Sequence, residues 1–147
     1  TGCEYGGLPW PQSGEIDIME YYPVNGVPQI LGNVASGAPG TSKAYWQAKK
    51  VPFSHFLEKD PDWAAKFHIW RMDWDRDWIR IYLDDELINE VDINRMQNTG
   101  SWSGYNPHRH PHYILINLAL GGSNGGPIDD SAFPFRYEID YVRVYQR

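Results

Sequence analysis

The chain has 147 residues, 41% hydrophobic and 15% aromatic, which is enough for one domain with a sizeable core. Its net charge of −6 disfavours nucleic acid as a partner, because a phosphate backbone attracts basic surfaces. No apolar run is long enough to span a membrane. We see no repeat and no change of composition at a boundary, so we expect a single domain over residues 1–147.

The first strong strand signal covers residues 14–22, where three carboxylates alternate with apolar side chains. In a strand, residues two apart share a face, so Glu15 and Asp17 point the same way. Glu20 lies three residues beyond Asp17, and a regular strand would turn it into the core as an unpaired buried carboxylate. We therefore expect a β-bulge at Ile18-Met19, which returns Glu20 to the face of the other two acids.

Three acids on one face suit the cleavage of a glycosidic bond. One carboxylate attacks the anomeric carbon, and a second, kept protonated, delivers a proton to the leaving oxygen. Repulsion between like charges raises the pKa of at least one acid, and the three would titrate as a coupled set. The plainer alternative is a solvated strand face that is acidic by chance. The apolar and aromatic residues on both sides of the acids favour the catalytic interpretation.

The rest of the chain alternates strand signals with turns and contains almost no helix signal. After an Asn-Gly turn at residues 25–26, strands are expected at 29–36, 44–51, 67–73, 78–83, 86–91, 112–119 and 136–145. The strand at 112–119 is expected to be buried. Between residues 54 and 65 we expect at most one short helical turn, starting near Pro61. This pattern predicts an all-β architecture.

Residues 97–112 form a long predicted loop that contains His108, His110 and His112. Alternating histidines are able to ligate a transition metal. The prolines between them favour a cleft wall instead. His68 lies within an alternating strand pattern and is expected to be a packed structural residue.

The stretch Glu-Ile-Asp-Ile-Met-Glu, preceded by Trp10-Pro11 and Gly14, resembles the active-site signature of glycoside hydrolase family 16. Two residues between Asp17 and Glu20 resemble the bulged, laminarinase-like branch of that family. Similar blocks follow in the family's order at 67–74, 82–86, 113–122, 133–134 and 140–145. The resemblance implies a jelly-roll β-sandwich, like that of concanavalin A, with a concave substrate cleft. It also implies the C-terminal part of the usual domain, without its N-terminal strands.

The resemblance implies a role for each acid. Glu15 corresponds to the nucleophile and Glu20 to the general acid and base of a retaining, double-displacement mechanism. Asp17 lies between them and sets their orientation and protonation. No cofactor is implied for catalysis.

The resemblance also indicates residues outside the acidic stretch. Expected substrate contacts are Trp10, Asn33, Trp102 and Asn117. The alternatives are a hydrophobic plug at the rim of the sandwich for Trp10, a buried structural amide for Asn33, and a residue that orients one of the carboxylates for Asn117. Asp140 resembles a ligand of a structural calcium. The chain departs from the family where Asn33 and its neighbours carry no histidine, and where Ser123-Asn124 replaces a tryptophan.

We therefore predict an endo-acting, retaining β-glycanase whose partner is a polysaccharide. A β-1,3-glucan such as laminarin is the first choice, a mixed-linkage glucan the second and a red-algal galactan the third. A non-catalytic carbohydrate-binding module is the alternative from another class. A missing N-terminal segment of the same domain is a further expected partner. The family implies a secreted, periplasmic or cell-surface location.

Overall fold

A computed structural model of the chain describes residues 7–38, 43–99 and 103–146. By internal contacts the chain divides into two compact units, residues 1–115 and residues 116–147, and each is described by itself. In the described residues, no helix is long and apolar enough to cross a membrane.

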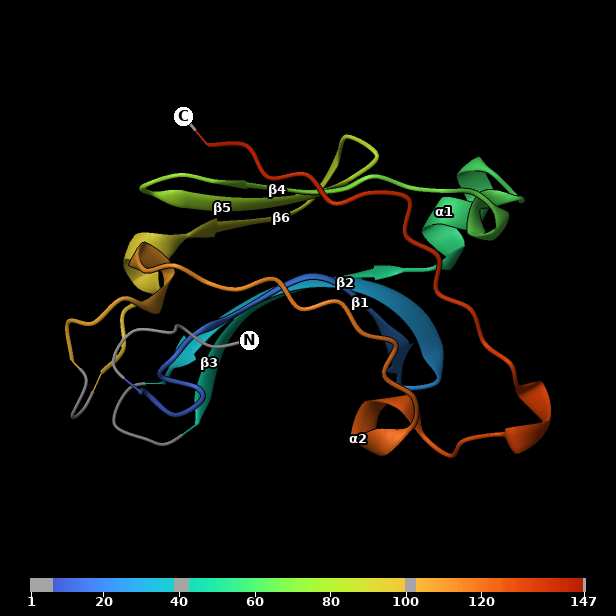
Figure 1. Cartoon of the computed structure of the whole chain (residues 1–147), viewed down its shortest axis with the longest axis horizontal. Coiled ribbons are helices and arrows are strands. Elements are labelled where there is room, and N and C mark those ends of the chain that lie inside the picture. Colours follow the sequence, from blue (N-terminus) through green and yellow to red (C-terminus); the bar gives the residue numbers. More distant parts are fainter. Residues whose placement is uncertain (1–6, 39–42, 100–102, 147) are drawn as a thin grey trace. The chain divides into compact units, whose positions relative to one another are not determined.

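Three antiparallel strands form the first sheet of the larger unit, in the order β1-β2-β3 (Figure 1). They are β1 (Glu15–Val24), β2 (Val27–Gly37) and β3 (Ala44–Pro52). The turn between β1 and β2 uses Asn25 and Gly26 with φ of 52° and 78°, as a tight hairpin turn requires. The register shifts between Asp17 and Glu20, which confirms the predicted bulge.

The second sheet has the order β4-β5-β6 and is also antiparallel (Figure 1). Its strands are β4 (Trp70–Trp74), β5 (Trp78–Leu83) and β6 (Glu86–Asp92). The connection from β3 contains α1 (Ser54–Lys59) and η1 (Trp63–Ala65), so a six-residue helix precedes Pro61, where we had expected at most one turn. Short helical turns follow at η2 (Ile93–Arg95) and η4 (Pro107–Arg109).

The core lies between the two sheets. Its buried side chains include Ile30 and Val34 from β2 and Ile79, Ile81 and Leu83 from β5. A Cβ added to Gly32 would lie 3.2 Å from Ile81, so the sheets approach closely at this position. The side chains of Ile16 and Ile18 also pack against this cluster, as the alternation in β1 predicts.

The predicted loop at 97–112 is fixed to the first sheet by buried polar side chains. Asn98 accepts a hydrogen bond from the Gly37 amide at 2.7 Å and donates one to the Gln12 carbonyl at 2.7 Å. His108 Nε2 lies 3.1 Å from the Ala35 carbonyl. Gly14 has a φ of 75°, and a Cβ there would lie 2.7 Å from Pro107. The loop therefore packs against the start of β1 and fixes its position.

The predicted strands at 112–119 and 136–145 are wrong. In the structure neither segment joins a sheet, although His112 forms an isolated bridge, and their side chains are largely exposed; Leu115, for example, is 57% exposed. A strand needs a hydrogen-bonding neighbour, and the apolar pattern of a segment does not supply one. The smaller unit has its own short helices, α2 (Gly122–Gly125) and η5 (Asp130–Ala132).

Candidate active site

The three carboxylates of β1 lie on the face of the first sheet that is turned away from the core. Across the ladder Glu15 is opposite Ala35, Asp17 is opposite Asn33 and Glu20 is opposite Leu31. Directly opposed residues share a face, while the residues between them on β2 are core residues. The bulge therefore brings all three acids to one side, although their sequence spacing is uneven.

Two hydrogen bonds orient the Glu15 carboxylate. Trp10 Nε1 donates to Glu15 Oε2 at 2.6 Å, and the Asp17 side chain forms the second hydrogen bond. Trp10 nevertheless remains 54% exposed. The indole therefore holds Glu15 with its edge while its ring stays accessible to a ligand. Stacking of a sugar on this ring stays a prediction.

Asp17 is the most perturbed acid of the three. Burial raises the pKa of its carboxyl to about 8, and repulsion from Glu20 and Glu15 adds to the shift. At neutral pH Asp17 is therefore protonated, and in this form it donates the hydrogen bond to Glu15. Its Oδ2 atom is buried and has no hydrogen-bond partner among the described residues. A neutral Asp17 between Glu15 and Glu20 therefore reduces the repulsion among the three acids.

Glu20 is held by an amide from the neighbouring strand. Asn33 Nδ2 donates to Glu20 Oε2 at 2.6 Å, and Asn33 is only 3% exposed. Burial raises the pKa of Glu20 above its usual value, the hydrogen bond from Asn33 opposes this rise, and Glu15 adds to it. Asn33 is therefore a buried amide that binds the carboxyl group of Glu20. Its contact with a sugar stays a prediction.

We expect replacement of Asp17 by Asn to stabilise the fold above about pH 4. The pKa of Asp17 is raised from 3.8 to about 8 on folding, so folding at pH 7 requires proton uptake. This cost is absent at low pH and grows as the pH rises through this range. Because Asn is neutral and donates a similar hydrogen bond, the gain should grow with pH between about 4 and 8, by up to about 1.4 kcal/mol for each pH unit.

Denaturant unfolding of both proteins between pH 4 and pH 8 measures this effect. Asp77→Asn, which replaces an exposed carboxylate outside the acid face, is the matched control and should show no such trend. A stability difference between wild type and Asp17→Asn that does not change with pH would contradict the protonated state of Asp17.

Three predicted site residues lie outside the described part of the larger unit. Trp102 lies outside the described residues. Asn117 and Asp140 belong to the smaller unit, so their roles stay predictions. No group of three His, Cys, Asp or Glu side chains in the described ranges is arranged to hold a metal ion. Calcium binding at Asp140 therefore stays a prediction.

Two aromatic residues on the acid face were not singled out from the sequence. Tyr22 shares this face, and burial together with Glu20 and Asp17 raises the pKa of its hydroxyl. Trp46 on β3 is opposite Ala35, which is itself opposite Glu15. The Asn25-Gly26 turn fixes the pairing of β1 with β2. The strand register that follows from this turn predicts that Tyr22 lies on the acid face.

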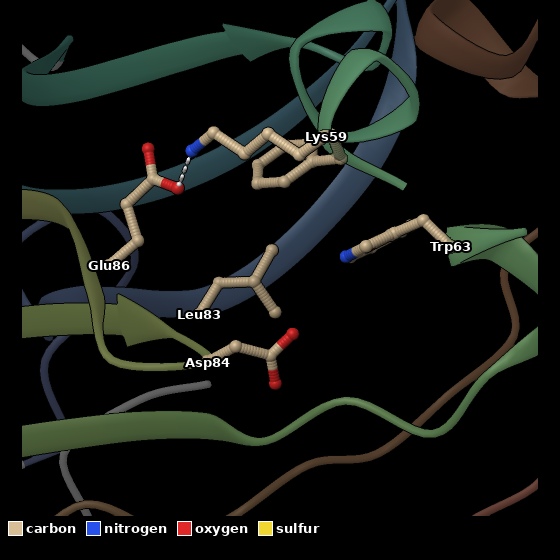
Figure 2. A pocket seen from close by; sticks show the side chains of 6 residues that line it. Lys59, Trp63, Leu83, Asp84 and Glu86 are labelled. Carbon is tan, nitrogen blue, oxygen red and sulfur yellow. Dashed lines mark hydrogen bonds and ion pairs between the residues drawn. The ribbon is translucent and has the colours of Figure 1, made fainter. Parts of the chain in front are cut away.

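A pocket of about 260 Å³ lies elsewhere in the larger unit, between α1, η1 and the turn from β5 to β6. Figure 2 shows the Lys59 ammonium bonded to the Glu86 carboxylate near Leu83. The distance from Lys59 Nζ to Glu86 Oε2 is 2.7 Å. Phe56 and His68 stack on Trp63 at centroid distances of 4.9 and 3.8 Å. The pocket therefore offers little free aromatic surface to a sugar.

His68 has a structural role beside this pocket. Its Nδ1 lies 2.5 Å from Asp84 Oδ2 and its Nε2 lies 2.7 Å from the Trp63 carbonyl. With 11% of its side chain exposed, it confirms the prediction of a packed residue.

Comparison with known proteins identifies the family of the chain. The family model of glycosyl hydrolases family 16 matches residues 10–143. A β-glucanase of Rhodothermus marinus is 32% identical over 97% of this chain and 48% of its own length. A glucan endo-1,3-β-glucosidase of Cryptopygus antarcticus is 34% identical over 97% of this chain and 52% of its own length. The chain thus spans about half the length of these curated relatives.

Solved structures give the same result for the fold. The LamA catalytic domain of Zobellia galactanivorans superimposes with a TM-score of 0.63 at 25% identity, over 88% of this chain and 45% of that one. The two packed antiparallel sheets agree with the predicted jelly-roll β-sandwich. Because the family model matches most of the chain, the chain belongs to the glycosyl hydrolases family 16.

Proposed function

We propose that the protein is a retaining endo-β-glycanase that hydrolyses internal bonds of a β-1,3-glucan. The observation that carries this proposal is the pair Glu15 and Glu20, brought to one face by the bulge and held there by separate hydrogen bonds. Two oriented carboxyl groups on one face are what double displacement at an anomeric carbon requires.

In this mechanism Glu20 donates its proton to the glycosidic oxygen while Glu15 attacks the anomeric carbon. The bond to the leaving sugar breaks, and a glycosyl ester forms on Glu15. Glu20, now a carboxylate, then accepts a proton from the water that hydrolyses this ester. Its raised pKa favours the protonated form for the first step, and the hydrogen bond from Asn33 stabilises the anion needed for the second.

The choice of substrate is supported by the relatives. Their names describe a β-glucanase and a glucan endo-1,3-β-glucosidase, and both contain the matched region. Mixed-linkage glucan and red-algal galactan are the other polysaccharides to be tested. A polymeric glucan is met outside the cytoplasm, so the proposal includes a secreted, periplasmic or cell-surface location. No cofactor takes part in the proposed steps.

A carbohydrate-binding module without turnover is the alternative function. Such a module needs aromatic surfaces and hydrogen bonds but not a buried, protonated acid between two glutamates. The cost of burying Asp17 and Glu20 therefore favours catalysis over binding alone.

The proposal is tested by reducing-end release from laminarin, mixed-linkage glucan, agarose and carrageenan. We expect release from laminarin by the wild type and none by Glu15→Gln. Release from one of the other polymers would support the assignment as a hydrolase and would identify a different substrate. Binding of laminarin without release by folded full-length protein would support the binding module.

We expect replacement of Asn33 by Ala to change the pH profile of the hydrolase. The hydrogen bond from Asn33 lowers the pKa of Glu20, so its removal lets that pKa rise further. The alkaline limb of kcat/KM should move to higher pH, because Glu20 keeps its proton longer. The rate should also fall by roughly tenfold, because the acid is less well oriented.

The profile of kcat/KM against pH on soluble laminari-oligosaccharides measures this shift. Ala48→Gly, at the position opposite Asn33 on β3, is a control for a change of volume near this amide. A profile that keeps its shape while KM rises would instead indicate that Asn33 contacts the sugar directly.

A further inference from the structure

We infer that Trp46 is a sugar-binding residue of the same face, which stacks on a glucan unit beyond the one bound at Glu15. This inference rests on the proposed function, because it assigns a second contact to the same polysaccharide. It concerns how the chain of sugars is held, and it leaves the chemistry at Glu15 and Glu20 unchanged.

The strand register places Trp46 in one row with Glu15. Glu15 on β1 is opposite Ala35 on β2, and Ala35 is opposite Trp46 on β3. Directly opposed residues share a face, so Trp46 lies on the same side of the sheet as the acids. Since neighbouring strands are about 4.8 Å apart, the backbone of Trp46 lies about 10 Å from the backbone of Glu15. That separation is longer than one pyranose ring.

The two indoles are neighbours beside Glu15. The ring centroids of Trp10 and Trp46 are 6.5 Å apart, with an angle of 50° between the rings. Trp10 is in turn bonded to Glu15 by its indole nitrogen. Ala35, fully buried in the row between Glu15 and Trp46, contributes only a methyl group. The two rings therefore provide aromatic groups between Glu15 on β1 and the edge of the sheet at β3.

Both rings remain open to solvent although they contact each other. Trp10 is 54% exposed and Trp46 is 42% exposed. A tryptophan has a large apolar ring, and its exposure beside a reactive site is typical of a binding surface. The C–H groups of a β-linked glucopyranose form an apolar face that packs on such a ring. The ligand class of this surface is therefore a neutral glucan chain.

A purely structural role for Trp46 makes a different prediction. If Trp46 only supported Trp10, its removal would disturb the sugar bound at Glu15 and would affect substrates of every length equally. If Trp46 binds a more distant sugar, only substrates long enough to reach it should be affected. The dependence on chain length therefore separates the two roles.

The test compares kcat/KM of wild type, Trp46→Ala and Trp46→Phe in the full-length protein. The substrates are an aryl laminaribioside and reduced laminari-oligosaccharides of increasing length. We expect Trp46→Ala to lose about tenfold or more on the long oligosaccharides and less than about twofold on the short aryl substrate. Trp46→Phe keeps an aromatic face and should recover most of the loss. Phe67→Ala removes a ring that is 69% exposed in the segment before β4 and should leave every rate unchanged.

Trp46→Leu is measured in parallel, because it keeps apolar contact with Trp10 without an aromatic face. Thermal unfolding identifies which variants are folded, and Trp46→Leu should show the same length-dependent loss as Trp46→Ala. Equal losses on short and long substrates, or no loss on either, would overturn the inference while leaving the hydrolase in place. A wild type that releases nothing from any β-1,3-glucan would instead overturn the proposed function.

Discussion

Replacement of Glu15 by Gln should reduce hydrolysis of the glucan by at least about 10³-fold, because an amide cannot form the glycosyl ester. The fold should survive, since Gln has nearly the same shape and its oxygen still accepts the hydrogen bond from Trp10. Initial rates of reducing-end release, with the Tm of both proteins, measure these two effects separately.

The matched control is Glu58→Gln. It makes the same chemical change at an exposed glutamate of α1, outside the acid face, and should leave the rate unchanged. Activity of Glu15→Gln within tenfold of the wild type, in a preparation free of wild-type enzyme, would contradict the assignment of Glu15 as nucleophile.

Replacement of Glu20 by Ala should lower the rate on a natural glucan by about 10² to 10⁴-fold, because both proton transfers lose their side chain. An aryl glycoside with a good leaving group should lose less in the first step, since its departure needs little help from an acid. Sodium azide should then restore turnover of this substrate, because an anionic nucleophile needs no general base. The product should be a β-glycosyl azide.

The rate of release of the aryl group with and without azide measures this rescue. Glu58→Ala should show neither the loss nor any response to azide. A Glu20→Ala enzyme that loses equally on both substrates and ignores azide would contradict the role of Glu20 as acid and base.

The arrangement of the three acids could be predicted from the sequence because a large energy depended on it. An unpaired carboxylate in the core costs several kcal/mol, and only an extra residue between Asp17 and Glu20 avoids this cost. The register shift at this position confirms that argument. The tight turn at Asn25-Gly26 was predictable for a similar reason, because few residues accept a positive φ.

The partners of the acids could not be predicted from the sequence. Asn33 binds Glu20 and Trp10 binds Glu15 through single hydrogen bonds that depend on register and side-chain rotamers. For Asn33, the sequence is equally compatible with a sugar contact and with a buried amide, because no large energy difference favours one of them. The sequence predicts only that Trp46 lies in a strand, because its place beside Glu15 depends on the pairing of three strands.

For the segments 112–119 and 136–145, the strands predicted from the sequence are absent from the structure. Their apolar residues favour strands, and the prediction followed that preference. A strand also needs a partner in hydrogen bonding, which is a property of the whole arrangement rather than of the segment. Among the described residues, ladders form only within the two three-stranded sheets, so these segments are not strands of either sheet.

The measurement that tests the central claim most directly is the anomeric form of the first product, followed by proton NMR during hydrolysis of a laminari-oligosaccharide. Double displacement through Glu15 predicts that the β-anomer is released first and the α-anomer appears only by mutarotation. The parallel sample of Glu15→Gln should release neither anomer. Early release of the α-anomer by the wild type would show a single displacement and would contradict a nucleophilic Glu15.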